Sequence, residues 1–234
     1  MKLSVIVTVH AGTEKYFEEC LESIKAQVVK PHEIIVVVDG YIKPMIYPDT
    51  TTIIRNQNKG IAFSRDQGVK LSTGNYLLFI DADDVIPEDY IMRMASVIRW
   101  KKADIIYPSC LLWCKWGTEA PQENGFFDPP NMITLDNMLV RNNILISSVI
   151  KREVYDRIGG FDPDLIMFED WYFFLEALVL KYKFHHAGTF LKYRQRQLSR
   201  NHVNEEHKAR ITQKIRDMIL TKYPLLKTKM KKIQ

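Results

Sequence analysis

One segment, residues 76–84 with the sequence YLLFIDADD, constrains the fold more than any other part of the chain. It opens as a continuous apolar run, which is typical of a strand buried on both faces of a parallel sheet. The run ends abruptly in Asp81, Asp83 and Asp84. Ligands gather outside the carboxyl ends of such strands. The cluster is therefore badly placed for packing and well placed for binding.

Asp81 and Asp83 are separated by a small alanine, so their carboxylates can bracket a divalent ion or a ribose. Hard oxygen ligands of this kind suit Mg²⁺ or Mn²⁺, which usually keep waters and accept phosphate oxygens at the remaining positions. Asp84 can share this role with Asp83, and the sequence does not rank the two. Aspartate is also common in polar turns, so a plain turn is the alternative interpretation.

Apolar runs alternate with helical patterns along most of the chain. This strand–helix–strand order predicts an α/β fold with a mostly parallel central sheet, flanking helices and right-handed crossovers. Strands are expected at residues 3–9, 33–38, 51–55, from 76, 103–108, 144–150 and 184–194. Helices are expected after Thr13, at residues 61–71, from Pro87, and at 135–140, 152–158 and 169–180. Residues 109–133 lack a clean period and predict a long loop or hairpin, which in a compact domain is often functional.

The composition is that of an ordinary globular protein, with 234 residues of which 46% are hydrophobic and 26% charged. This length predicts one sizeable α/β domain, or one domain with a small appendage. We expect a cytoplasmic location, because the sequence has no apolar run of about 18 residues and begins without a recognisable signal peptide. Its three cysteines are odd in number, which fits a reducing compartment.

Positive charge is concentrated at the end of the chain. Residues 192–234 hold 13 Lys or Arg and three acids, whereas the chain as a whole carries a net charge of +5. Such a basic helix and tail can contact phosphates, anionic lipid headgroups at the inner face of a membrane, or nucleic acid. The alternative is a solvated helix with a frayed end.

Four more polar residues fall at predicted strand ends or loop-to-helix joints, on the sheet edge where the Asp81 cluster is expected. They are Thr8, His10, Asp39 and Arg65. Asp39 can accept hydrogen bonds from a uracil-like base or a ribose, and His10 can stack on a base. Arg65 can reach phosphate with its planar fork. The alternatives are a turn-initiating Asp, a loop His and an exposed helix charge.

A second acidic cluster, Glu169 and Asp170, precedes the aromatic pair Trp171 and Tyr172. A carboxylate here can accept a proton from an acceptor hydroxyl, with flat aromatic faces as a wall for a sugar ring. The start of a helix also favours acids through its dipole. The residues alone leave both interpretations open.

Several blocks together resemble the family 2 glycosyltransferases, which have the GT-A nucleotide-sugar transferase fold. The blocks are SVIVTVH, EIIVVVDG, NKGIAFSRDQGVKLSTGNYLLFIDADD and SSVIKREVYDRIGGFDPDLIMFEDWYFFLEAL, and they occur in the family's order over residues 3–180. The resemblance implies an inverting, metal-assisted transfer of a sugar from a nucleoside diphosphate, expected to be UDP, to an acceptor hydroxyl. A saccharide or a lipid-linked or otherwise phosphate-bearing molecule is the expected acceptor.

The same resemblance assigns roles to individual residues. Nucleotide-holding positions of the family match Thr8, His10, Asp39 and Arg65. Positions that hold ribose, diphosphate and Mn²⁺ or Mg²⁺ match Asp81 and Asp83, and Asp170 matches the base. Glu169 and Trp171 are then expected on the acceptor side.

Two departures from the family pattern matter. Many members have two acids where this chain has Val38-Asp39, which implies fewer contacts to the nucleobase. Members often carry Tyr-Arg-x-His where this chain has Tyr193-Arg-Gln-Arg196, so the His that completes the metal site is replaced by Arg196. Arg196 can neutralise the diphosphate directly, and His202 is a substitute ligand.

We therefore predict a glycosyltransferase domain over residues 1–191, with a nucleotide-binding half at 1–108 and an acceptor-binding half at 109–191, followed by a basic tail at 192–234. Residues 109–148 and the tail are expected to shape the acceptor site. One alternative is a catalytically silent nucleotide-sugar-binding subunit. Another is a nucleotidyltransferase, for which we would expect a glycine-rich phosphate loop near the amino terminus, where this chain has HAGTEKY.

Overall fold

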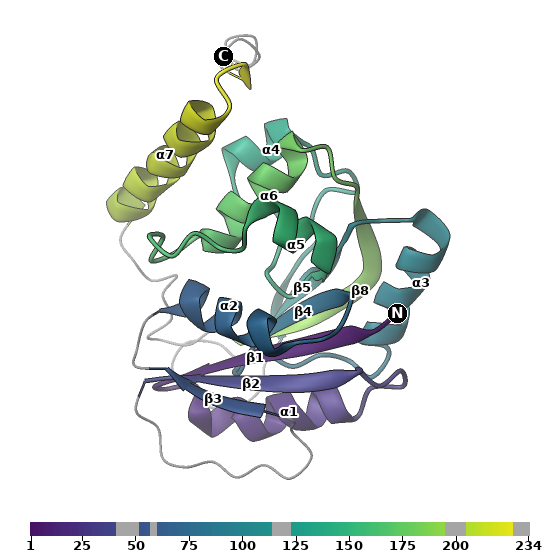
Figure 1. The fold of residues 1–234 in the computed structure, drawn as a ribbon. Coiled ribbons are helices and arrows are strands. Elements are labelled where there is room, and N and C mark those ends of the chain that lie inside the picture. Colours follow the sequence, from purple (N-terminus) through teal and green to yellow (C-terminus); the bar gives the residue numbers. More distant parts are fainter. Residues whose placement is uncertain (41–51, 57–59, 114–122, 195–204, 227–234) are drawn as a thin grey trace.

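The computed structural model describes residues 1–40, 52–56, 60–113, 123–194 and 205–226. Strands and helices alternate in the first half of the chain, and helices predominate toward its end (Figure 1). The strands are β1 (Leu3–His10), β2 (Glu33–Asp39), β3 (Thr52–Asn56), β4 (Tyr76–Asp81), β5 (Ile105–Trp113), β6 (Glu123–Phe127), β7 (Val149–Lys151) and β8 (Phe184–Arg194). The helices are η1 (Glu14–Tyr16), α1 (Phe17–Lys25), α2 (Ile61–Leu71), α3 (Tyr90–Lys101), α4 (Leu135–Val140), α5 (Arg152–Ile158), α6 (Glu169–Val179) and α7 (Glu205–Lys222).

All strands belong to one sheet with the order β3-β2-β1-β4-β7-β5-β6, and β8 pairs with β5. The pairs β2–β3, β1–β2, β1–β4 and β5–β8 are parallel. Strand β7 is antiparallel to both neighbours, and β6 is antiparallel to β5. The predicted α/β class and mostly parallel sheet are thus confirmed, and the carboxyl ends of β1, β2 and β4 meet at one edge.

Helices cover both faces of this sheet, as Figure 1 shows for α1 and α2 on opposite sides of β1 and β2. The alternation of side chains along each strand separates two cores. Ile6, Val37 and Phe79 face α2, α5 and α6, whereas Val7 and Ile80 face α1 and α3. Burial on both faces explains why these strands read as continuous apolar runs.

The segment before β7 differs from the prediction. A strand was expected over residues 144–150, but strand pairing begins only at Val149. Asn142 Oδ1 accepts a hydrogen bond from the backbone N–H of Ile144, and the side chain of Asn143 donates to the carbonyls of Asn137 and Arg141. Asparagine side chains that satisfy local backbone groups compete with a sheet ladder. The segment is therefore a loop despite its buried isoleucines.

Helix α7 packs on the body of the protein. Ile215 and Ile219 are fully buried and belong to the same core cluster as α5 and α6. Strand β8 also continues past residue 191 to Arg194. The division at residue 191 stays a prediction, but the elements after it share their core with the elements before it.

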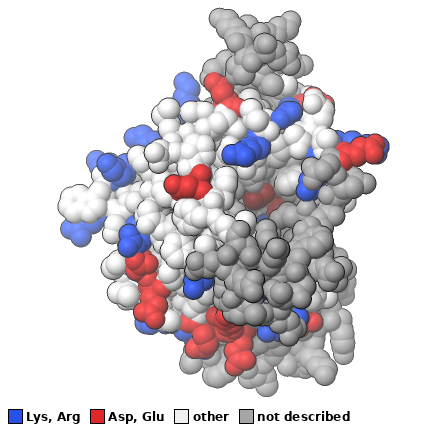
Figure 2. Space-filling model, turned by 180° about the vertical axis from the view of Figure 1, so that it is seen from behind, with Lys and Arg blue, Asp and Glu red and all other residues white. Residues whose placement is uncertain are grey.

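Several cations at this end of the chain have structural partners. Arg216 donates to the carbonyls of Leu139 and Val140, and Lys222 pairs with the buried Glu176. On the face in Figure 2, acidic and basic side chains are interspersed among the described residues. That face is therefore not a uniformly basic surface. Within the ranges that the structure describes, no helix is both long and apolar enough to cross a bilayer.

The contact between α2 and β1 gives a test of the packing. A Cβ on Gly68 would lie 2.4 Å from Ile6 Cγ2 and 3.2 Å from Val37 Cγ2. Because the Ile6 side chain is branched and fully buried, we expect Gly68→Ala to lower the free energy of unfolding by about 1–3 kcal/mol, the usual cost of overpacking. Urea unfolding followed by circular dichroism measures this change.

The matched control is Lys70→Ala, at an exposed position of the same helix, which should change the stability by less than about 0.5 kcal/mol. Equal stabilities of the two variants would contradict the close α2–β1 contact.

Candidate active site

Strand β1 lies between β2 and β4 and sets which side chains meet at the sheet edge. His10 is level with Asp39 of β2, and Thr8 is level with Asp81 of β4. Thr8 Oγ1 donates to Asp81 Oδ1 at 3.1 Å, and Asp39 Oδ2 accepts from the N–H of Gly60 at 3.1 Å. The predicted edge of polar residues is therefore formed by strand register. Asp39 and Thr8 are buried, whereas His10 and Asp81 line a pocket.

Arg65 connects this edge to the start of α6. Its Nη2 donates to Asp81 Oδ1 at 2.8 Å, and its Nη1 pairs with Glu169 Oε1. The Arg65 and Glu169 side chains are only 4% and 7% exposed. The residue predicted to be an exposed helix charge or a phosphate ligand is thus a buried cation between two acids that lie far apart in the sequence.

These ion pairs change the proton affinities of the groups involved. Burial acts to lower the pKa of Arg65, but the charges of Asp81 and Glu169 raise it above its usual value. Burial likewise acts to raise the pKa of Asp81, and the Arg65 charge and hydrogen bond hold it below its usual value. Arg65 and Asp81 are therefore both charged over the physiological pH range.

The loop after β4 is held from the other side by β8. The N–H of Arg194 donates to Asp84 Oδ1 at 3.2 Å, and Arg194 Nε donates to the carbonyl of Asp83 at 3.0 Å. The Arg194 guanidinium also pairs with Glu19 and stacks 4.3 Å from the Tyr16 ring. Asp84 therefore anchors the loop, while the Asp83 side chain lines the pocket. This arrangement makes Asp83 a better candidate ligand than Asp84.

Asp170 stands at the start of α6 with its carboxylate toward the same pocket. Asp170 Oδ1 accepts from the N–H of Trp171 at 2.7 Å, and Oδ2 accepts from Asn142 Nδ2 at 3.3 Å. Burial and then the neighbouring charge of Glu169 raise the pKa of Asp170 to about 7, against the opposing effect of Arg65. Such a carboxylate is a suitable general base near neutral pH.

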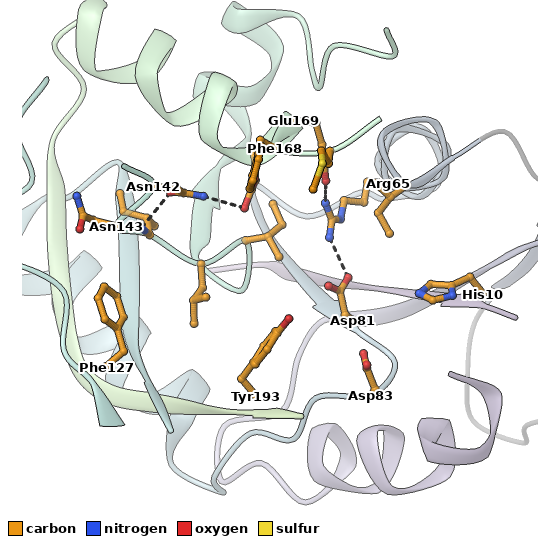
Figure 3. Close-up of a pocket in the computed structure, with 16 residues that line it drawn as sticks. His10, Arg65, Asp81, Asp83, Phe127, Asn142, Asn143, Phe168, Glu169 and Tyr193 are labelled. Carbon is orange, nitrogen blue, oxygen red and sulfur yellow. Dashed lines mark hydrogen bonds and ion pairs between the residues drawn. The ribbon is translucent and has the colours of Figure 1, made fainter. Parts of the chain in front are cut away.

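The pocket has a volume of about 320 Å³ and two chemically different walls. In Figure 3, Asp81 and Asp83 extend from the end of β4, and Glu169 and Phe168 come from the start of α6. Arg65 lies between Glu169 and Asp81 in this view, with His10 to one side. Aromatic and amide side chains complete the lining, notably Phe127, Asn142, Asn143 and Tyr193.

The two residues predicted on the acceptor side are placed differently from each other. Glu169 lines the pocket, but one of its oxygens is taken by Arg65. Trp171 is 2% exposed and its indole N–H donates to the carbonyl of Met138 at 2.7 Å. The structure thus does not bring Trp171 to the pocket, because α6 turns this side chain into the core. Phe168, three residues earlier in the chain, packs edge-to-face against the Trp171 ring and lines the pocket.

Several site residues were not singled out from the sequence. Phe127 comes from the segment without a clean period, and Asn142 lies between a predicted helix and a predicted strand. Arg194 was visible only as part of the Tyr-Arg-Gln-Arg run. That run was a usable signal, since an arginine next to a pocket tyrosine at a strand end suggests an anchoring role. Arg196 and His202 lie outside the described residues.

The candidate metal ligands in the pocket supply part of the coordination shell of a hard divalent ion. Asp81 and Asp83 offer carboxylate oxygens at one wall, and Asp81 Oδ1 is already shared by Thr8 and Arg65. Among the residues that the structure describes, no group of three His, Cys, Asp or Glu side chains is assembled for a metal. The two aspartates therefore suit an ion such as Mg²⁺ or Mn²⁺, which takes its other ligands from phosphate and water.

Comparison with known proteins identifies the family. Residues 4–161 match Glycosyl transferase family 2, and the chain belongs to this family. It is 30% identical over 187 residues to the uncharacterized glycosyltransferase YwdF of Bacillus subtilis, covering 76% of this chain and 68% of that protein. It is 26% identical over 187 residues to the glucosyl-dolichyl phosphate glucuronosyltransferase of Haloferax volcanii, covering 70% of this chain and 57% of that protein.

Solved structures confirm the GT-A fold. Residues 1–349 of TarS from S. aureus in complex with UDP superpose with a TM-score of 0.66 at 20% identity, over 94% of this chain and 65% of that one. The mannosyltransferase PcManGT from Pyrobaculum calidifontis, in complex with GDP-Man and Mn²⁺, gives a TM-score of 0.62 at 17% identity, over 91% and 60% of the two chains. The chain thus spans about two thirds or less of these structures.

The raised pKa of Asp170 predicts a pH-dependent cost to stability. Below the ordinary carboxyl pKa of about 4 the group is protonated in both states. The cost grows as pH rises from there to the raised folded value and is fully present above it. We expect Asp170→Asn to be more stable than wild type at pH 8, by about 1–3 kcal/mol, with the difference shrinking toward pH 4. Urea unfolding at both pH values measures this.

Asp156→Asn, at an exposed position of α5, serves as the control and should not change the pH dependence. An Asp170→Asn variant that is no more stable than wild type at pH 8 would count against a desolvated carboxyl at this position.

Proposed function

We propose that the protein is an inverting glycosyltransferase that moves a sugar from a nucleoside diphosphate sugar, with UDP as the expected nucleotide, to an acceptor hydroxyl. The proposal rests on the arrangement of carboxylates in the pocket, in a chain that belongs to glycosyl transferase family 2. One wall of the pocket carries Asp81 and Asp83, which suit a diphosphate and its metal. The other wall carries Asp170, a carboxylate whose pKa is raised to about 7.

The donor half of the site is assigned to the sheet edge. We assign the base and ribose to Asp39 and His10, which are level with each other on β2 and β1, and Thr8 donates a hydrogen bond to Asp81. Asp81 and Asp83 would hold Mg²⁺ or Mn²⁺ together with the diphosphate. Such an ion stabilises the negative charge that gathers on the leaving diphosphate. TarS with UDP and PcManGT with GDP-Man and Mn²⁺ share the fold and support this assignment.

The acceptor half is assigned to the opposite wall. Asp170 accepts the proton of the acceptor hydroxyl as that oxygen attacks the anomeric carbon from the face opposite the diphosphate. A single in-line displacement needs one base and inverts the configuration. Asn142, which donates to Asp170 Oδ2, keeps that oxygen directed at the pocket. Phe168 and Tyr193 supply apolar surface for a sugar ring.

Donor binding gives the first test. We expect isothermal titration calorimetry to detect UDP binding in the presence of Mn²⁺, and Asp83→Ala to weaken it at least tenfold because the diphosphate and its ion lose a ligand. The carbonyl of Asp83, which Arg194 uses, remains in this variant, so the fold should persist by circular dichroism.

Asp156→Asn again provides the control and should bind UDP as wild type does. Unchanged binding by a folded Asp83→Ala variant would remove Asp83 from the donor site.

Turnover tests the base. With a panel of donor sugars, we expect Asp170→Asn to lower kcat by about 10²–10⁴-fold, the usual contribution of a positioned base, while UDP binding is retained. In wild type, kcat should fall about tenfold per pH unit below the raised pKa of Asp170, because only the ionised carboxylate accepts a proton.

A normal rate in Asp170→Asn would overturn the base assignment. Slow donor hydrolysis in the absence of acceptor separates a working transferase from a silent nucleotide-sugar-binding subunit, which would show none.

A further inference from the structure

The guanidinium of Arg65 occupies the same carboxylate that is proposed to hold the metal. Its Nη2 lies 2.8 Å from Asp81 Oδ1, the oxygen that Thr8 also contacts at 3.1 Å. Within the described residues, Asp81 Oδ2 takes no hydrogen bond. A metal at this wall therefore has to share Asp81 with a cation that is already in contact with it.

The other end of the Arg65 fork is fixed by Glu169. The two side chains are buried, and Nη1 pairs with Glu169 Oε1. The remaining nitrogen, Nε, is buried without a partner among the described residues. Arg65 is thus held by its two acids, and Glu169 can retain it if Asp81 is taken by another cation.

We infer that Arg65 is an internal counter-ion that competes with the divalent metal for Asp81. In the donor-free protein Arg65 neutralises Asp81, so the free ion binds weakly. When the ion arrives with the donor diphosphate, the added phosphate ligands offset the competition, and Arg65 is kept by Glu169. The inference rests on the proposed function, and it makes metal binding dependent on the donor.

The electrostatic reason is simple. A dication beside Asp81 is repelled by the guanidinium, and the Asp81 charge is divided between the two. Without Arg65, the charge of Asp81 would no longer be shared with a guanidinium. Glu169 then has a defined role: it is the second anchor of Arg65, which explains why an acid next to the proposed base is buried and ion-paired.

The test measures Mn²⁺ binding in the absence of nucleotide by the loss of the free-ion signal in electron paramagnetic resonance. The double variant Arg65→Gln, Glu169→Gln removes one cation and one anion, so the net charge is unchanged and no unpaired Glu169 is left as a new ligand. We expect it to bind Mn²⁺ at least tenfold more tightly than wild type. Adding Asp81→Asn to the double variant should abolish the gain.

A matched control is the double variant Arg93→Gln, Asp89→Asn, which removes a partly exposed ion pair between α3 and its N-cap residue and should leave Mn²⁺ affinity unchanged. The single variant Glu169→Gln gives an independent measurement if the double variant does not fold by circular dichroism. It leaves Asp81 as the acid that holds Arg65, and we expect Mn²⁺ affinity at least threefold below that of wild type.

Unchanged Mn²⁺ affinity in the folded double variant, or equal or tighter binding in Glu169→Gln, would overturn the inference. A failure of the proposed function is distinguishable, because it would appear as absent UDP binding and turnover while the Mn²⁺ affinities still differed as stated.

Discussion

Arg65 is the point at which the two walls of the pocket are joined. It comes from α2, and it holds Asp81 at the end of β4 and Glu169 at the start of α6. Removing one partner of such a buried pair usually costs about 3–5 kcal/mol, because a charge is left without compensation. The relative position of the end of β4 and the start of α6 therefore depends on one buried cation, and any change at Arg65 affects both.

The same cluster sets the chemistry of Asp170. Burial and the Glu169 charge favour the protonated carboxyl, and Arg65 opposes them. Without Glu169 the arginine would stabilise the ionised form of Asp170 more strongly and make it a weaker base. The adjacent acids thus have separate tasks, since one binds the arginine and the other keeps a proton affinity near neutrality. A destabilised carboxylate in a folded protein is typical of sites where function opposes stability.

The sequence predicted the class of the fold and much of the sheet edge, because both depend on local patterns. Continuous apolar runs identified β1, β2 and β4, and the residues at their carboxyl ends were predicted to lie together without knowledge of the register. Other features depend on contacts that no local pattern encodes. The Arg65–Glu169 pair joins residues 104 positions apart, and the loop before β7 depends on asparagine side chains that replace a ladder. Trp171 was expected at the pocket, but the run of apolar and aromatic residues at 171–175 of α6 does not show which face of the helix is buried.

Through Arg194, the loop after β4 depends on β8, a strand that comes much later in the chain. Its hydrogen bond to Asp84 joins residues 110 positions apart, and Val85 and Lys192 are bridged beside it. Strands β1, β2 and β4 all precede β8 in the chain, so they are synthesised before it. During that interval the loop that carries Asp83 lacks its anchor. The contacts that hold the loop carrying Asp83 from this side therefore form only once β8 has docked.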